Sequence, residues 1–270
     1  MSKQVDGLPS ALQSINEIEQ RIRSKRVAVF LDYDGTLTPI VSRPELAVFS
    51  DETRHVVSEL ATRCPVVVVT GRDRSDVQSL VALDHISYVG SHGFDIVGPD
   101  GKEKPHPESI GLPPILDDLE DTLQRRFNDV LAVRLQRKKY SLSVHYRGVS
   151  DNRVSDVERI VDEEIAARKE IRKTHGKKVF EIQPQIDWHK GKAVLYLLGL
   201  LGLDGPDRVP IYVGDDITDE NAFLAIRERG IGVHVKDGVQ TTAAHYTLEN
   251  TDEVPRFLQA LSGILDEDLP

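Results

Sequence analysis

The chain has 270 residues, of which 39% are hydrophobic and 29% are charged, and its formal net charge is −10. This length suits one core with a sizeable insertion, and this composition allows a substantial core to be buried. The acidic balance argues against a general nucleic-acid binder, which usually presents a basic surface. It does not argue against binding of a phosphorylated small molecule, because a local cluster of metal, lysine and backbone N–H groups can hold a dianion on an acidic protein.

Targeting signals are not evident in the sequence. No apolar run approaches the ~18–20 residues that a membrane helix needs, so we expect no membrane association. The first twenty residues carry charges and no apolar segment of the kind found in secretory signals. The single cysteine, Cys64, cannot form an internal disulfide and lies in a hydrophobic stretch, which favours a buried core thiol. Together these features predict a cytoplasmic protein.

Several short apolar runs end in polar residues and alternate with helical patterns. The runs predict buried strands at 27–31, 65–69, 86–89, 209–213 and 231–235. The intervening patterns predict helices at 11–24, 50–63, 74–83 and 191–200, and Ser50 is the expected N-cap of the second. This alternation predicts an α/β fold with a Rossmann-like parallel sheet, in which ligands bind outside the carboxyl ends of the strands.

The middle of the chain breaks this alternation. Three prolines and a glycine between residues 99 and 107 indicate a linker or turn. Beyond it we expect helices at 113–128 and 151–170 and strands at 131–135, 140–146 and 178–182. These elements predict an α+β unit inserted at 104–186, so that residues 1–103 and 187–270 form one discontinuous domain.

The most informative motif is the run DYDGTLT, residues 32–38, directly after a buried strand. Asp32 and Asp34 can both point into the crevice where the strand ends, and Gly35 allows a sharp turn. Paired carboxylates repel one another unless a cation lies between them, and magnesium suits a site of few carboxylates, phosphate and water. The alternative is a capped turn, since Asp beside Gly is common in loops.

Two further motifs could hold a phosphate group. Thr70, Gly71 and Arg72 follow the second strand, where a hydroxyl and backbone N–H groups at a strand-to-helix junction can bind phosphoryl oxygens. Lys190 and Lys192 open a later helix, and a lysine there could neutralise charge on a transferred phosphoryl group. The alternatives are an ordinary turn and solvated lysines.

The last motif is GDDITDE, residues 214–220, again after an apolar strand. Its four acidic residues within six positions are costly to bring together without a cation. The helix dipole favours acidic residues at a helix N-terminus, and this alternative accounts for some of the charges. It accounts poorly for all four beside a second acidic pair.

Taken in order, these motifs resemble the haloacid dehalogenase (HAD) superfamily of phosphatases, and in detail the trehalose-6-phosphate phosphatases. The resemblance covers about residues 26–260. It rests on the segments DYDGTLTPI at 32–40, GSHG at 90–93, HYR at 145–147, EIQP at 181–184 and GDDITDE at 214–220. It implies a HAD hydrolase core with an inserted cap domain that acts as a lid over the substrate.

The resemblance also implies roles for individual residues. Asp32 would be the nucleophile that forms an aspartyl-phosphate, and Asp34 would protonate the departing sugar oxygen and then activate water. Thr70 and the Gly71 N–H would bind phosphoryl oxygens. Lys190, rather than the lysine two residues later, would neutralise charge at the nucleophile.

By the same resemblance, the cofactor would be Mg²⁺. Its ligands would be the Asp32 side chain, the Asp34 backbone carbonyl and Asp215, with Asp216 and Asp219 supporting it from close by. In the insert, the expected contacts to the sugar are Lys138, His145, Arg147 and Glu181.

The implied reaction is the hydrolysis of trehalose 6-phosphate to trehalose and phosphate in trehalose biosynthesis, with a functional link to a trehalose-phosphate synthase. Two alternatives remain. One is a HAD phosphatase for another sugar phosphate, such as sucrose phosphate, a glucosylglycerol phosphate or a phosphorylated hexose. The other is a non-catalytic domain of the same fold that senses a sugar phosphate.

Overall fold

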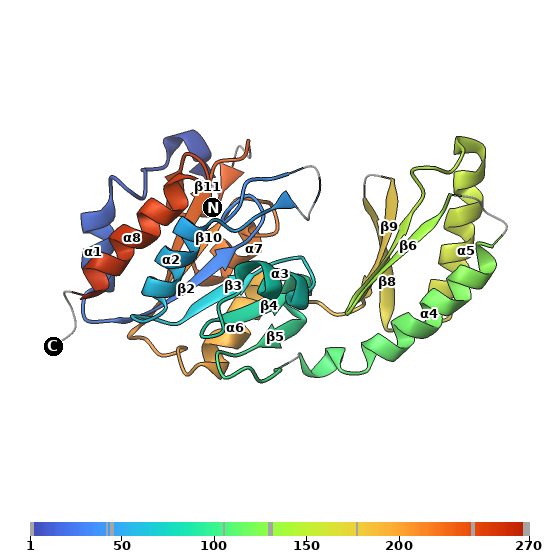
Figure 1. The fold of residues 1–270 in the computed structure, drawn as a ribbon, viewed down its shortest axis with the longest axis horizontal. Helices are drawn as coiled ribbons and strands as arrows, with labels where there is room; N and C mark the ends of the chain where they lie inside the picture. The colour runs from blue at the N-terminus through green and yellow to red at the C-terminus, as the bar shows by residue number, and fades with distance from the viewer. Residues whose placement is uncertain are drawn as a thin grey trace. The chain divides into compact units, whose positions relative to one another are not determined.

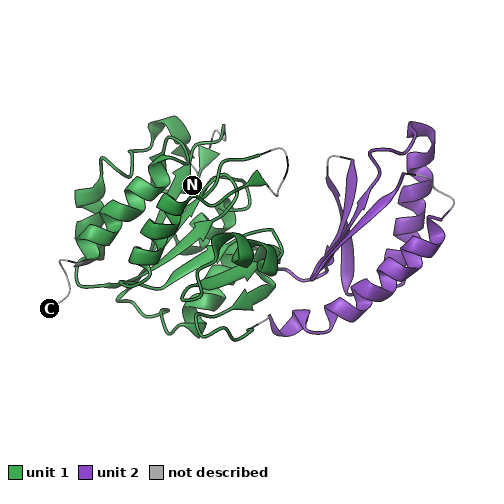
Figure 2. Cartoon of the chain, viewed as in Figure 1, with its two compact units in different colours: residues 1–104, 188–270 green, residues 105–187 purple. Residues whose placement is uncertain are grey.

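The chain forms two compact units, one discontinuous and one continuous (Figure 2). The first contains residues 1–104 and 188–270, and the second contains residues 105–187. This computed structural model describes residues 3–41, 43, 46–104, 106–128, 132–176, 178–238 and 241–266.

A seven-stranded sheet forms the centre of the first unit (Figure 1). Its strands lie in the order β13-β11-β10-β2-β3-β4-β5, and every neighbouring pair is parallel except β4 and β5. Their bounds are β2 Arg26–Asp32, β3 Val66–Val69, β4 Ser87–Gly90, β5 Asp95–Val97, β10 Arg208–Gly214, β11 Ile231–Val235 and β13 Tyr246–Leu248. The predicted α/β fold class is confirmed.

Helices cover both faces of this sheet. Side chains of α1, α2, α3 and α8 pack into the apolar core on one face, and those of α6 and α7 pack into the core on the other. Figure 1 shows α1, α2 and α8 together on their face. The bounds are α1 Ile15–Ile22, α2 Asp51–Leu60, α3 Arg74–Val81, α6 Lys190–Leu200, α7 Glu220–Ile226 and α8 Glu253–Asp266. Smaller elements are β1 Lys3–Gln4, paired with β12 Thr241–Thr242, and the 3₁₀ turns η1 Val5–Gly7 and η3 Ser91–Gly93.

The double cover explains why the strands are continuously hydrophobic. In β2, Ala28 and Phe30 point to the α6 and α7 side, while Val29 and Leu31 point to the opposite side, and all four are buried. A strand buried on both faces needs apolar residues at every position, rather than at every second one. The same reason accounts for the four consecutive valines of β3.

The second unit is a four-stranded antiparallel sheet with two long helices. Its strands lie in the order β6-β7-β9-β8. The bounds are α4 Leu112–Arg126, β6 Arg134–Lys138, β7 Ser141–His145, α5 Val154–Ala166, β8 Ile171–Gly176 and β9 Val179–Pro184, with 3₁₀ turns η4 Pro107–Ser109 and η5 Asp151–Arg153. Leu142 and Val144 of β7 are buried with Phe180 and Ile182 of β9, so one face of the sheet is apolar.

Some predicted boundaries were wrong. The strand expected at 131–135 lies at Arg134–Lys138, because a short turn at 139–140 joins β6 to β7 and sets their register; residue 131 is outside the described part. The helix expected at 151–170 ends at Ala166, since Ile171 enters a fourth strand that periodicity did not reveal. The helix expected at 11–24 is limited to Ile15–Ile22. Strands β5, β8 and β13 and helices α7 and α8 had not been predicted.

Cys64 has the buried position expected from the sequence, with 6% of its surface exposed. Burial raises the pKa of its thiol to about 12, so the group stays protonated and unreactive near neutral pH.

Among the described residues, no helix has both the length and the apolar character that crossing a membrane requires.

The N-cap predicted for the second helix gives a stability test. The Ser50 hydroxyl accepts a hydrogen bond from the Thr53 N–H at 3.1 Å and so satisfies a free N–H of the first turn of α2. Replacing Ser50 by Ala should lower the free energy of unfolding by about 1 kcal/mol, while Ser50→Asp, which keeps an acceptor, should lose little. Urea denaturation of both variants measures this. Equal losses in the two would show that the cap is not the cause.

Candidate active site

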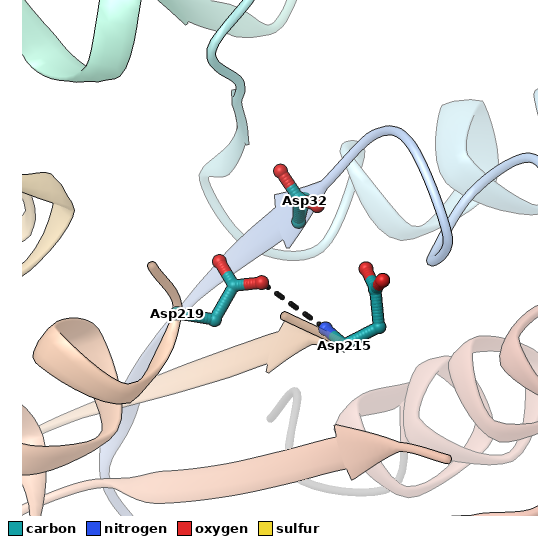
Figure 3. A group of neighbouring side chains, drawn as sticks. All are labelled: Asp32, Asp215 and Asp219. Carbon is teal, nitrogen blue, oxygen red and sulfur yellow. Dashed lines mark hydrogen bonds between the residues drawn. The ribbon is translucent and has the colours of Figure 1, made fainter. Parts of the chain in front are cut away.

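The polar motifs converge at the carboxyl edge of the central sheet. Asp32 is the last residue of β2, Thr70 follows β3, and Asp215 follows β10. These strands are neighbours in the order β10-β2-β3 and are parallel, so their carboxyl ends meet at one edge. Figure 3 shows the side chains of Asp32, Asp215 and Asp219 gathered there. The crevice outside such an edge is where ligands bind in open α/β sheets.

A buried lysine connects two of these carboxylates. Lys190 is the first residue of α6, and its Nζ lies 2.8 Å from Asp32 Oδ1 and 2.8 Å from Asp219 Oδ1. All three side chains are almost completely buried. Charges removed from water are tolerated when they are paired and hydrogen-bonded, and this cluster meets both conditions.

The site perturbs the proton affinities of its members. Burial raises the pKa of Asp32 well above its ordinary value, and the charge of Asp219 adds to this while Lys190 opposes it. Burial also raises the pKa of Asp219. For Lys190, burial alone lowers the pKa, but the charges of Asp32 and Asp219 outweigh it and hold the pKa above its ordinary value. The ammonium therefore stays charged beside the carboxylates.

Asp219 is fully engaged in hydrogen bonds. Its Oδ1 accepts from the Tyr212 hydroxyl at 2.6 Å as well as from Lys190, and its Oδ2 accepts from the N–H groups of Asp215 and Asp216, each at 3.1 Å. The dashed line in Figure 3 marks the bond to Asp215. Asp219 therefore fixes both the lysine and the turn that follows β10.

Asp216 stabilises the same turn. Its Oδ1 accepts from the N–H and the hydroxyl of Thr218, at 2.7 and 2.6 Å, and from the Asp219 N–H at 3.2 Å. Burial opposes its charge, but Lys190 and the Thr218 bonds hold the pKa of this carboxyl below its ordinary value. The structure therefore gives Asp216 a local, turn-forming position.

Only one of the two Asp215 carboxylate oxygens accepts a hydrogen bond from the described residues. Its Oδ1 accepts from the Thr36 hydroxyl at 2.9 Å, whereas its buried Oδ2 has no hydrogen-bond partner among the described residues. Gly35, with φ +83°, makes this approach possible, because a methyl group in its place would overlap the Asp215 carboxylate. Burial raises the pKa of Asp215 to about 7. An unpaired buried acceptor is rare and points to a partner such as a cation.

These oxygens are suitable donors for a hard metal ion. Asp32, Asp215 and Asp219 each offer one oxygen, and the three atoms lie within 4.8 Å of one another. Oxygen donors of this kind suit Mg²⁺ or Ca²⁺. Because both Asp219 oxygens already accept two hydrogen bonds, Asp32 and the free Oδ2 of Asp215 are the better-placed ligands.

The loop after β3 has donors that could face an anion. The Thr70 hydroxyl oxygen accepts from the Arg72 N–H at 3.1 Å, which leaves its own hydrogen to donate elsewhere. Behind this loop, Ser91 N–H donates to the Arg72 carbonyl at 2.7 Å and His92 N–H donates to the Thr70 carbonyl at 3.0 Å. Gly71 lies between the two braced residues.

Asp34 is not part of the buried cluster. Its carboxylate accepts two bonds from Arg72, with Nε to Oδ2 at 2.7 Å and Nη2 to Oδ1 at 2.6 Å. About 41% of the Asp34 side chain is exposed, against 11% for Arg72. The structure therefore joins the first and second motifs by an ion pair that the sequence did not predict.

In the second unit, three of the four expected sugar contacts share one face of the sheet. The register places Lys138, His145 and Glu181 on the face opposite to the buried one, whereas Arg147 follows β7 in a turn. Glu181 accepts from the Ser143 hydroxyl at 2.7 Å, and His145 Nε2 lies 3.0 Å from Gln136 Oε1. Burial lowers the pKa of His145, so its imidazole is neutral near neutral pH.

Three residues that contribute to this arrangement had been given no role from the sequence, although Ser91 and His92 lie in the GSHG segment on which the family resemblance rests. Tyr212 lies inside an apolar strand, where a tyrosine is indistinguishable from a core residue until its hydroxyl is located. Ser91 and His92 both have left-handed backbone, with φ of 50° and 56°. Their position between two glycines was the available signal for an unusual turn.

The fold and this edge define a HAD-type α/β protein with a buried acidic cluster and a lysine at the carboxyl ends of its strands. Comparison with known proteins leads to the family: the trehalose-phosphatase profile matches residues 30–252. The chain belongs to the trehalose-phosphatase family.

Individual relatives agree with this membership. The chain is 39% identical to "Probable trehalose-phosphate phosphatase 2" of Oryza sativa subsp. japonica, over 96% of this chain and 74% of that protein. It is also 39% identical to "Probable trehalose-phosphate phosphatase D" of Arabidopsis thaliana, over 94% and 72%. The solved trehalose-6-phosphate phosphatase of Aspergillus fumigatus has the same fold, with a TM-score of 0.66 at 23% identity, over 95% of this chain and 99% of that one.

The cluster around Lys190 can be tested through stability. Removing its ammonium leaves Asp32 and Asp219 buried without their neutralising cation, so Lys190→Met should lower the free energy of unfolding by about 3–5 kcal/mol near neutral pH. The matched control is Lys192→Met, two residues on and only partly buried, which should cost less than about 1 kcal/mol. Denaturant titration without added metal measures both. Similar losses in the two variants would contradict the assignment of Lys190.

Proposed function

We propose that this protein hydrolyses trehalose 6-phosphate to trehalose and phosphate, by transferring the phosphoryl group to Asp32, with Mg²⁺ as cofactor. The observation that carries the proposal is the buried Asp32 at the end of β2, bonded to Lys190 and close to Asp215, whose Oδ2 has no partner within the described part of the chain. Family membership supports the substrate, since the similar proteins are named for it.

In the first step, an Asp32 oxygen attacks phosphorus and Asp34 donates a proton to the departing sugar oxygen. Thr70 and the Gly71 N–H hold phosphoryl oxygens, and Lys190 neutralises charge that the nucleophile and the phosphoryl group bring together. In the second step, Asp34 takes a proton from a water molecule that attacks the aspartyl-phosphate. This sequence is mostly positioning and charge neutralisation, as phosphoryl transfer requires.

The Asp32 side chain, the Asp34 backbone carbonyl and Asp215 are the proposed Mg²⁺ ligands. When bound, the ion supplies positive charge that offsets the phosphoryl oxygens and the two buried carboxylates. Asp219 contributes by holding the Asp215 N–H and Lys190 in place. The free Oδ2 of Asp215 supports this assignment, because a cation would satisfy it.

The polar face of the second unit is the proposed sugar-binding surface, with Lys138, His145 and Glu181 as contacts and Arg147 beside them. Supporting this, Ser143 holds Glu181 through a hydrogen bond, so the carboxylate is oriented before a sugar arrives. We also propose that a trehalose-phosphate synthase supplies the substrate, because glycosyl transfer to a sugar phosphate yields a phosphorylated disaccharide directly.

A phosphate-release assay over a panel of sugar phosphates tests the reaction. Trehalose 6-phosphate should have the highest kcat/KM, above sucrose phosphate, a glucosylglycerol phosphate and hexose phosphates. Asp32→Asn should lower kcat by at least about 10³-fold, because the nucleophile is lost, whereas Asp84→Asn, an exposed aspartate in the same unit, should not change it. Preference for another sugar phosphate would overturn the substrate. Binding without hydrolysis by the unaltered protein would favour a sensing domain.

Metal dependence has a test that does not need activity. Saturating Mg²⁺ at about 100 Kd should stabilise the EDTA-treated protein against unfolding by about 2.7 kcal/mol, since it binds only the native state. Asp215→Asn should lose most of this stabilisation, and NaCl at equal ionic strength should not reproduce it. Activity should disappear with EDTA and return with Mg²⁺. Full activity in EDTA would contradict the cofactor assignment.

The sugar contacts can be tested one at a time. Glu181→Gln should raise KM for trehalose 6-phosphate about 10-fold, because a hydrogen bond to a charged acceptor is weakened. Glu108→Gln, an exposed residue of the same unit, is the control. Steady-state kinetics of the two variants measure the difference. An unchanged KM in Glu181→Gln would remove Glu181 from the proposed surface.

A further inference from the structure

The Arg72 side chain forms a two-bond fork with Asp34. Nε donates to Oδ2 at 2.7 Å and Nη2 donates to Oδ1 at 2.6 Å, so each oxygen of the carboxylate accepts one bond from the same guanidinium. A bidentate guanidinium–carboxylate pair fixes orientation as well as charge, which a single-point lysine contact does not. The fork thus determines the direction in which Asp34 presents its oxygens.

Arg72 is itself held on several sides. Its backbone N–H donates to the Thr70 hydroxyl and its carbonyl accepts from Ser91, so the residue belongs to the braced loop after β3. Its guanidinium carbon lies 5.3 Å from the centre of the Tyr33 ring. Tyr33 is buried and donates to the Ala47 carbonyl at 2.8 Å. The fork is therefore anchored to the core, although Asp34 is partly exposed.

We propose that Arg72 is the positioning residue for the proton donor of this reaction: its fork orients the Asp34 carboxylate from the loop that carries Thr70 and Gly71. The proposal rests on the proposed function, in which Asp34 protonates the sugar oxygen. Orientation of the proton donor and binding of the phosphoryl group then depend on three consecutive residues. Before the first step one Asp34 oxygen takes up a proton from solvent, to which the side chain is 41% exposed, and its bond from Arg72 opens. That proton passes to the sugar oxygen as the bond from this oxygen to phosphorus breaks, while the other fork bond keeps the carboxyl group in place.

The choice of leaving group separates this role from phosphate binding. The sugar oxygen of trehalose 6-phosphate leaves well only if it is protonated, whereas p-nitrophenolate leaves as a stable anion. In kcat/KM, which reports only the steps up to release of the leaving group, a residue that acts through the proton donor should therefore matter for the first substrate and little for p-nitrophenyl phosphate. The second step, in which Asp34 activates water, is common to both substrates and does not enter this comparison. A residue that binds the phosphoryl group should matter for both.

The variants are Arg72→Ala, Arg72→Lys, Asp34→Asn and the double variant of Arg72→Ala with Asp34→Asn. Arg72→Ala should lower kcat/KM for trehalose 6-phosphate about 10²-fold, and kcat/KM for p-nitrophenyl phosphate less than about 3-fold. KM for trehalose 6-phosphate should change little. Arg72→Lys, which keeps one donor and the charge, should recover part of the loss. The double variant should be no slower than Asp34→Asn, because the two residues act through one group.

The control is Arg74→Ala, which removes a neighbouring arginine that pairs with Asp95 and Glu103 instead. Any loss there should be equal for both substrates, and thermal unfolding shows whether each variant is folded. Equal losses on both substrates in Arg72→Ala, no loss on either, or an additive double variant would each overturn the proposal.

Failure of the proposed function gives a different result. If the unaltered protein prefers another sugar phosphate, only the proposed substrate is wrong, and the same comparison is made with that sugar phosphate. If it hydrolyses none, the proposed function and this inference both fail.

Discussion

The buried bond between Lys190 and Asp32 is the interaction on which the rest of the site depends. Two carboxylates and one ammonium lie together out of water, and neither Asp32 nor Asp219 could remain charged there without the lysine. Asp219 also holds the N–H groups of the turn after β10 and the Tyr212 hydroxyl. One ionic cluster therefore sets the position of the proposed nucleophile and of the acidic turn.

The acidic residues around this cluster differ in how their carboxylate oxygens are hydrogen-bonded. Both Asp219 oxygens and the Oδ1 of Asp216 accept hydrogen bonds. The buried Oδ2 of Asp215, which can approach because Gly35 has no side chain, has no hydrogen-bond partner among the described residues. A protein that buries an acceptor without a partner loses stability, so such an atom indicates a function rather than a structural need. The Asp216 and Asp219 carboxylates hold the turn, and the unpaired Asp215 oxygen is left for a ligand.

The sheet was largely predictable and the insert was less so. Strands covered on both faces appear as unbroken apolar runs, and the four that end in the functional motifs were expected within one or two residues of β2, β3, β10 and β4. In the second unit one face is exposed, so the apolar signal is weaker. There β8 was not predicted, the helix before it was extended to residue 170, and β6 was placed three residues early because its register depends on pairing with β7.

The sequence by itself determined the fold class, the order of the motifs and the kinds of side chain at each strand end, because periodicity and turn residues act over a few neighbouring positions. Tertiary structure decided which of those side chains meet. Lys190 reaches Asp32 across 158 residues and Arg72 reaches Asp34 across 38. Such pairs depend on how helices pack on the sheet and on which oxygens remain after local hydrogen bonds form, and neither property is encoded in a local pattern.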